Sequence, residues 1–243
     1  MDGGSTDGSV SILDSSSGVI WKSEQDRGQS HALNKAFDAS NGDIIGWINS
    51  DDAYADRRAV EAAVQVFDNH PDVGVVYGHG LSIDANNRLL KFLWSPPLSI
   101  APLTIITPWV QPAVFVRRSV LETPMVDESL HFVMDKDLWR RLSKKTQFHR
   151  LNVIIGVDRF QPSRKTETGE YLEELQAFIS THPEYSRIHT SRTMRKVLQI
   201  GTRYAGLGPT LLLPNTLQEA FPLDLGSMKT RFVRQAFKSR ARG

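Results

Sequence analysis

The chain has 243 residues, 40% of them apolar, with no cysteine and a formal net charge of +2. That length is enough for one sizeable α/β domain with an appendage and a buried core. The lack of cysteine excludes a disulfide-stapled fold, a thiol nucleophile and a cysteine-ligated metal site. No apolar run is long enough to span a bilayer and no secretory signal is recognisable, so we expect a cytoplasmic protein.

Hydrophobic periodicity predicts alternating strands and helices through the first two thirds of the chain. In chain order we expect a short helix through 10–13, capped by Ser5 or Thr6, strand 18–21, helix 30–40, strand 43–48, helix 57–67, strand 73–77, a hairpin of 81–84 with 88–94, strand 111–117, helix 135–145, strand 149–160, and helices 167–180, 184–204 and 229–240. Such alternation is typical of βαβ units. It predicts an α/β fold with a mostly parallel sheet.

The small net charge hides an uneven distribution. Residues 1–185 hold 18 Lys and Arg against 25 Asp and Glu, whereas residues 186–243 hold 11 against 2. This asymmetry favours an acidic working domain followed by a helical basic C-terminal tail that meets an anionic partner, such as a membrane surface. One alternative is a solvated helical tail with no such partner, and another is a set of helices that pack over the preceding domain. Nucleic acid is disfavoured because few aromatic residues accompany the basic ones.

The clearest candidate site is the pair Asp51–Asp52, which follows the expected strand 43–48. Ligands of open α/β sheets bind beyond the carboxyl ends of the strands. Two adjacent carboxylates repel each other, and a hard divalent cation such as Mg²⁺ or Mn²⁺ would compensate their charge. The alternative interpretation makes Asp52 a helix cap and Asp51 a solvated neighbour.

Several segments, in their order along the chain, closely resemble the family 2 glycosyltransferases, which are inverting enzymes with the GT-A nucleotide-sugar-binding fold. The matching segments are Asp2-Gly3-Gly4-Ser5-Thr6-Asp7-Gly8, Glu24 to Lys35, Gly42 to Asp52, Gln111 to Arg118, and Asp127 to Leu142. The resemblance covers about residues 1–165. It implies a glycosyltransferase domain over 1–165 and leaves 166–243 as the helical basic segment.

The resemblance also implies roles for individual residues. Asp135 would be the general base that accepts the proton of the attacking hydroxyl, and Asp52 would bind the metal, Mg²⁺ or Mn²⁺. The residues expected to bind the nucleotide-sugar are Asp2, Arg27, Gly28, Asn34 and Asp51. The residues expected on the acceptor side are Trp109, Gln111 and Asp137. Asp137 has a second interpretation as a helix cap, and Trp109 as plain core.

The chain departs from the family pattern at three places. Family members begin with a strand, a helix and a second strand, and Met1 falls where that second strand would end, so we expect the first βα unit to be missing. Gln161 stands where many relatives carry a histidine that assists at the metal, and His31 where an acidic residue is common. These departures put the strength of donor binding in doubt.

The resulting hypothesis is a metal-dependent enzyme that moves a sugar from a nucleotide-diphosphate donor to a hydroxyl of a saccharide or lipid-linked saccharide acceptor, with inversion. Two alternatives remain open at this point. One is a non-catalytic nucleotide-sugar-binding protein or scaffold. The other is a nucleotidyltransferase, whose sheet also places carboxylates around a metal. Zinc hydrolysis is disfavoured because the seven histidines form no metal-binding pair.

Overall fold

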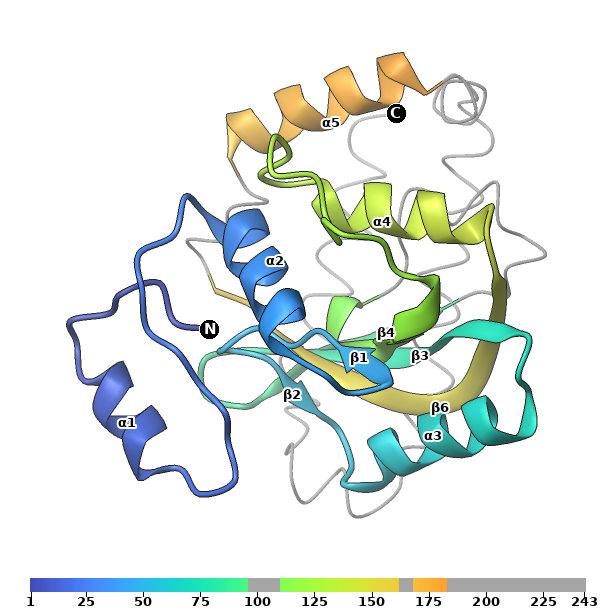
Figure 1. The fold of residues 1–243 in the computed structure, drawn as a ribbon, viewed down its shortest axis with the longest axis horizontal. Helices are drawn as coiled ribbons and strands as arrows, with labels where there is room; N and C mark the ends of the chain where they lie inside the picture. The colour runs from blue at the N-terminus through green and yellow to red at the C-terminus, as the bar shows by residue number, and fades with distance from the viewer. Residues whose placement is uncertain (96–109, 162–167, 183–243) are drawn as a thin grey trace, which may run out of the picture.

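The computed structural model describes residues 1–95, 110–161 and 168–182 (Figure 1). Its elements are α1 (Ser9–Ser15), α2 (Gln29–Ala39), β1 (Ile44–Gly46), β2 (Ala53–Tyr54), α3 (Arg58–Asn69), β3 (Val73–Ile83), β4 (Leu89–Leu93), the 3₁₀ turn η2 (Gln111–Ala113), β5 (Val114–Arg117), the 3₁₀ turn η3 (Arg118–Val120), α4 (Met134–Ser143), β6 (Gln147–Arg159) and α5 (Gly169–Thr181). Helices and strands alternate as the α/β class requires. The predicted fold class is therefore confirmed.

The six strands form one mixed sheet in the order β1-β5-β3-β6-β2, with β4 on the other end of β3. Among the described strands only β3 and β6 pair in parallel, and the other four pairings are antiparallel. The expectation of a mostly parallel sheet is therefore wrong. The reason is local: β3 turns straight back into β4 as a hairpin, and β5 runs antiparallel between β1 and β3.

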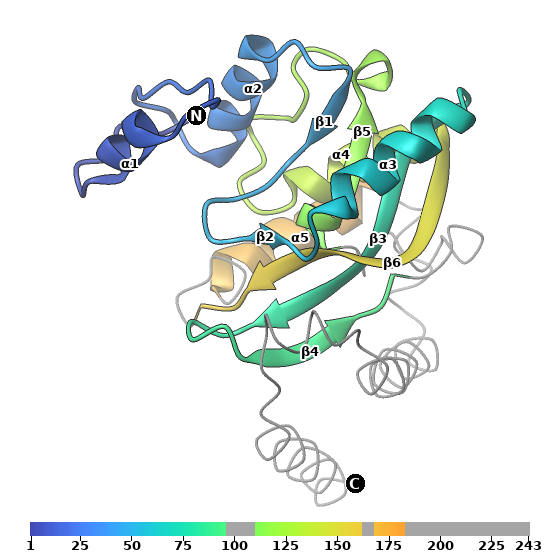
Figure 2. The same cartoon turned by 90° about the horizontal axis from the view of Figure 1, so that it is seen from below.

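The sheet is covered on both faces, with α3 on one side and α2 and α4 on the other (Figures 1 and 2). Alternate residues of the central strands supply the two cores, as the two-residue period of a strand demands. Val75 and Tyr77 of β3 pack with α2 and α4. Val76 packs with α3. A sheet buried on both faces explains why every residue of β3 is buried.

Two predictions for the N-terminal region are wrong. Helix α1 begins after Gly8, and neither Ser5 nor Thr6 caps it. The run 18–21 forms no strand: Ile20 is 94% exposed, and the nearest sheet pairing is a single bridge between Asp2 and Ser23. A short apolar run becomes a strand only where a neighbour offers its hydrogen bonds, and here no described strand lies alongside.

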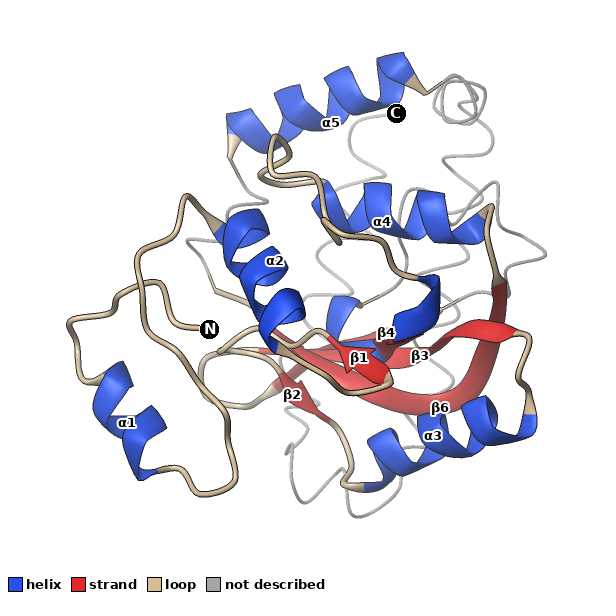
Figure 3. Cartoon of the chain, in the orientation of Figure 1, coloured by secondary structure: helices blue, strands red, loops and turns tan. Residues whose placement is uncertain are grey.

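The last described helix, α5, lies over α4 (Figures 1 and 3). Its Phe178 is buried against Val133, just before α4. The helix confirms the prediction for 167–180, whereas the predicted helices 184–204 and 229–240 lie outside the described residues. The domain boundary at 165/166 stays a prediction. Within the described residues, no helix has the length and apolarity needed to cross a membrane.

Candidate functional site

Asn49 lies at the centre of a polar network in the loop that follows β1. Its Oδ1 accepts hydrogen bonds from Gln29 Nε2 (3.0 Å) and Trp47 Nε1 (3.1 Å). Its Nδ2 donates to Asp52 Oδ2 (3.0 Å) and Gln111 Oε1 (2.9 Å), and Gln111 Nε2 donates in turn to the Trp47 carbonyl. One amide therefore joins the first turn of α2, the loop with the two aspartates and the turn η2.

Asp52 is partly buried at this position. Its Oδ1 accepts the backbone N–H of Arg159 (3.2 Å) in addition to the bond from Asn49. Burial, together with the charges of Asp158 and Asp51, raises the pKa of Asp52 to about 6, against the weaker opposing effect of these hydrogen bonds. A carboxylate that is expensive to ionise is the kind of group that a cation would stabilise.

Its neighbour Asp51 accepts hydrogen bonds from residues at and just after the end of β6. Asp51 Oδ2 accepts a hydrogen bond from Gln161 Nε2 (3.1 Å), and the Asp51 carbonyl accepts one from Arg159 Nε (3.1 Å). Gln161 stands where a histidine was expected, and here its amide contacts one of the two predicted site carboxylates. Strand β6 thus contacts both aspartates.

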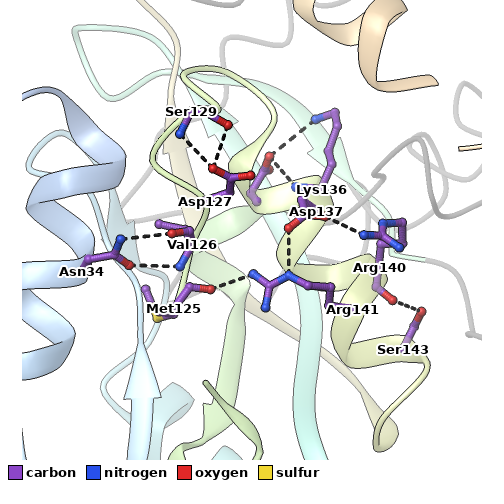
Figure 4. Close-up of polar contacts among 11 residues, drawn as sticks. Asn34, Met125, Val126, Asp127, Ser129, Lys136, Asp137, Arg140, Arg141 and Ser143 are labelled. Carbon is purple, nitrogen blue, oxygen red and sulfur yellow. Dashed lines mark hydrogen bonds and ion pairs between the residues drawn. The ribbon is translucent and has the colours of Figure 1, made fainter. Parts of the chain in front are cut away.

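The N-terminal end of α2 carries a second network. Arg27 donates to Glu128 Oε2 (2.7 Å), and Gly28, with φ 119°, is the residue before the helix. Asn34 is buried, and its side chain pairs with both backbone groups of Val126 (3.0 Å each), as Figure 4 shows, while also donating to Glu128 Oε1. Asn34 therefore fixes the segment before α4 against α2.

Asp2 is separate from these networks. Its carboxylate accepts hydrogen bonds from the backbone of Gly4 and Ser5 and from the hydroxyls of Ser5 and Ser23. The Ser23 hydroxyl, followed by the groups of Ser5, holds the pKa of Asp2 well below its usual range. In this structure Asp2 fastens the N-terminal loop to the residues before α2.

The two aspartates of α4 differ sharply. Asp135, in the first turn, is partly exposed, and its Oδ1 accepts the N–H of Lys136 (2.7 Å). Asp137 is buried between Arg140 and Arg141, at 2.8 Å from each (Figure 4). Burial alone would raise the pKa of Asp137, but the two arginines outweigh it and lower that pKa. Asp137 makes ion pairs rather than a side-chain cap of the helix.

The structure thus brings Asp52 and Gln111 together through Asn49, and Arg27 and Asn34 together through Glu128. Among the described residues, Asp2, Asp135 and Asp137 form no hydrogen bond or ion pair with another predicted site residue. Trp109 lies outside the described residues. The roles assigned to these residues stay predictions.

The sequence motifs assign no role to Asn49, Gln29, Glu128 or Glu174. Asn49 and Glu128 belong to the quoted motifs, so their position in those motifs was an available signal. Gln29 is next to Gly28 at the start of α2. Glu174 lies on α5, outside the resemblance, and no feature of the sequence links it to the site.

Comparisons with known proteins identify the family and the fold of the chain. The family model "Glycosyl transferase family 2" matches residues 1–122, which is half of the chain. A comparison with curated protein sequences finds no match. The sheet and helices resemble the crystal structure of S. aureus TarS 1-349 in complex with UDP-GlcNAc (TM-score 0.55, 16% identity, 74% of this chain and 55% of that one).

Two further TarS structures are similar. One is the crystal structure of S. aureus TarS 1-349 (TM-score 0.52, 17% identity, covering 74% of this chain and 53% of that one). The other is the crystal structure of S. aureus TarS (TM-score 0.50, 16% identity, covering 72% of this chain and 32% of that one). The chain therefore spans about half the length of the TarS 1-349 structures. At such identities the likeness shows the fold, while the family model identifies the family. The chain belongs to glycosyl transferase family 2.

Proposed function

We propose that the protein transfers a sugar from a nucleotide-diphosphate donor to a hydroxyl acceptor, with inversion and with the help of Mg²⁺ or Mn²⁺. The observation that carries the proposal is the network of Asn49, which gathers the first turn of α2, Asp52 and Gln111 at one place beyond β1. In α/β sheets this is where phosphate-bearing ligands bind. The UDP-GlcNAc in the similar TarS crystal structure supports a nucleotide-sugar as the donor.

The residues present fit a metal held jointly with the substrate. No group of three or more His, Cys, Asp or Glu that could hold an ion occurs in the described part of the chain. Mg²⁺ and Mn²⁺ do not need such a cage, because one or two carboxylates with substrate phosphates and water complete their coordination. Asp52 would supply the protein ligand, and its neighbour Asp51 would contact the nucleotide-sugar. The metal would offset the charge that develops on the leaving nucleoside diphosphate.

Asp135 is proposed as the general base. Inverting transfer requires one carboxylate that removes the proton from the acceptor hydroxyl while its oxygen attacks the anomeric carbon from the face opposite the leaving group. Asp135 is partly exposed, whereas the neighbouring Asp137 is engaged by Arg140 and Arg141. Gln111, and Trp109 beyond the described residues, are proposed on the acceptor side.

A saccharide acceptor, lipid-linked or free, remains part of the proposal. The basic segment 186–243, which lies outside the described residues, would favour a peripheral position at an anionic membrane surface. Binding of the full chain to vesicles with and without anionic lipid tests this point. Equal binding to both would contradict it.

The function is tested by measuring release of nucleoside diphosphate from a panel of nucleotide-sugars, beginning with UDP-GlcNAc, with Mn²⁺, with Mg²⁺ and with a chelator. Release that needs the metal, and that disappears in Asp135→Asn while calorimetric donor binding remains, is the expected result. Donor binding without any turnover would favour a scaffold. Formation of a nucleotide-sugar from a sugar phosphate and a nucleoside triphosphate would favour a nucleotidyltransferase.

A further inference from the structure

Helix α5 places a carboxylate against the residues that lead into α4. Glu174 Oε1 accepts hydrogen bonds from the backbone N–H groups of His131 (3.2 Å), Phe132 (2.7 Å) and Val133 (2.9 Å). Glu174 Oε2 accepts a second one from His131 (3.0 Å). Three consecutive amides of the chain thus converge on one side chain that is 41 to 43 residues away in sequence.

Such an arrangement is a strong restraint on the backbone. Consecutive N–H groups form a concave site for an anion, and hydrogen bonds to a charged acceptor are about twice as strong as neutral ones. Val133 is fully buried and Phe132 is partly buried, so their amides would be costly to leave without an acceptor. Glu174 therefore fixes the conformation of 131–133 rather than merely touching it.

Apolar and aromatic contacts hold α5 in the orientation that this carboxylate needs. Phe178 is 6% exposed and packs with Val133, and Phe132 meets the Tyr171 ring edge-on with centroids 6.3 Å apart. Leu175 also packs in this cluster. The contacts come from both turns of α5 that flank Glu174, so the carboxylate is carried by a docked helix.

Asp135 lies two residues after the last of the three amides. Val133 is the residue immediately before α4, and Asp135 is in the first turn of the helix. Its neighbour Lys136 has Nζ 3.8 Å from Asp135 Oδ1 and 5.9 Å from the centre of the Tyr171 ring. Helix α5 therefore contacts the chain on both sides of Asp135, through Glu174 before it and through Tyr171 at Lys136 after it.

We propose that Glu174 is a positioning residue for the transfer reaction: it fixes the amides of 131–133 and thereby the place from which Asp135 acts. This inference rests on the proposed function, in which Asp135 is the base. It predicts that α5 is required for turnover although it lies beyond the part of the chain matched by the family model. A shift of about 1 Å in a reacting group lowers the rate up to about a hundredfold.

The test compares Glu174→Ala, Glu174→Gln and the matched control Glu173→Ala in the full chain. Glu173 is exposed on the same helix, so its loss removes a charge from α5 without touching the amides. Thermal unfolding verifies that all variants fold. Donor KM and kcat are measured with the nucleotide-sugar that the wild type turns over, and hydrogen exchange is followed at the amides of Phe132 and Val133.

In Glu174→Ala we expect kcat to fall tenfold to a hundredfold, donor KM to stay within about twofold, and the two amides to exchange faster. Glu174→Gln keeps one oxygen acceptor at the same length but loses the charge and the second oxygen, so it should recover part of kcat and of the protection. Glu173→Ala should match the wild type. Wild-type kcat in Glu174→Ala, or equal losses in the Ala and Gln variants, would overturn the inference alone. A wild type that turns over no nucleotide-sugar would instead overturn the proposed function and this inference with it.

Discussion

Asn49 Nδ2 lies 3.0 Å from Asp52 Oδ2 and donates a hydrogen bond to it. The remaining capacity of the Asn49 amide is also used, by Gln29, Trp47 and Gln111. A primary amide has two donor hydrogens and one oxygen with two lone pairs, so all four are engaged. Asn49 is therefore the residue that sets how the predicted metal ligand, the first turn of α2 and the turn η2 lie relative to one another.

Replacing Asn49 with alanine should damage both the site and the fold. Four partners would lose a hydrogen bond in a partly buried place, so the free energy of unfolding should fall by about 1–3 kcal/mol. Metal-dependent donor binding should weaken about tenfold, because Asp52 and Gln111 would no longer share a partner. Chemical denaturation and calorimetry measure the two effects. The control is Asn41→Ala, at an exposed position, and donor binding that is unchanged in Asn49→Ala would contradict the organising role.

The raised pKa of Asp52 makes a prediction about pH. Its pKa is about 6 in the folded protein, against an ordinary value of 3.8. A group with a raised pKa in the folded state favours folding when protonated, so this contribution is complete below pH 4 and is lost as the pH rises through 6. Asp52→Asn stays neutral at every pH. The variant should therefore be more stable than the wild type at pH 7, and the difference should vanish near pH 4.

The same proton competes with a metal. If Asp52 is a ligand, Mn²⁺ binding in the presence of donor should weaken about tenfold per pH unit below 6 and should be lost in Asp52→Asn. Calorimetry at pH 5 and pH 7.5 measures this, with the exposed Asp38→Asn as the control for a charge removed elsewhere. Mn²⁺ binding of equal strength at both pH values would show that Asp52 is not the ligand.

The elements that periodicity predicted well are those whose own residues decide their structure. Helix α2 and helix α3 carry continuous apolar stripes, and three residues of the apolar run before Asp51 form β1. The direction of a strand depends instead on how it is connected to its neighbours. Strands β4 and β5 both run antiparallel to β3, so the expectation of a mostly parallel sheet is wrong. The run 18–21 has strand composition but no neighbouring strand, so it stays exposed.

The site shows the same division. The motifs identified Asp52 and Gln111 as candidate site residues. They did not predict the hydrogen bonds of Asn49 that join the two, because a hydrogen-bond partner depends on tertiary packing. Gln161 was noted only as a departure, yet its amide contacts Asp51. Glu174 carries no local signal at all. From the sequence, a glutamate on a helix is expected to be a solvated charge. Only the tertiary structure shows that the backbone amides of 131–133 donate to Glu174.

Gly156 in β6 should tolerate no side chain, because the turn that bears Gln111 lies directly against it. A Cβ at Gly156 would lie 2.7 Å from Ala113 N and 2.8 Å from the Pro112 carbonyl carbon, both of them backbone atoms. Gly156→Ala should therefore displace η2 and lower the free energy of unfolding by about 1–3 kcal/mol. Gly169→Ala is the matched control, since nothing lies within 4 Å of its Cβ position. Equal stability of the two variants in denaturation would contradict the close approach.

The last prediction separates the two aspartates of α4. Asp137 is 11% exposed and pairs with Arg140 and Arg141, so Asp137→Asn removes a shared counter-charge from two partly buried guanidinium groups. The free energy of unfolding at pH 7 should fall by about 3 kcal/mol. Because the folded pKa of Asp137 lies below 3.8, its stabilisation is present above that value and is lost as the pH falls through the folded pKa. The deficit of the variant should therefore shrink below pH 4.

Asp135→Asn should do the opposite, because its oxygen takes one local N–H, from Lys136, which an amide oxygen can also accept. Stability should change little, whereas turnover should fall about a hundredfold or more if Asp135 accepts the acceptor's proton. Denaturation curves and kcat, measured on both variants, give four numbers. The opposite pattern would contradict this assignment: Asp135→Asn would lose much of its stability, while Asp137→Asn would keep its stability and lose turnover. In that case Asp137 would be the base and Asp135 the structural residue.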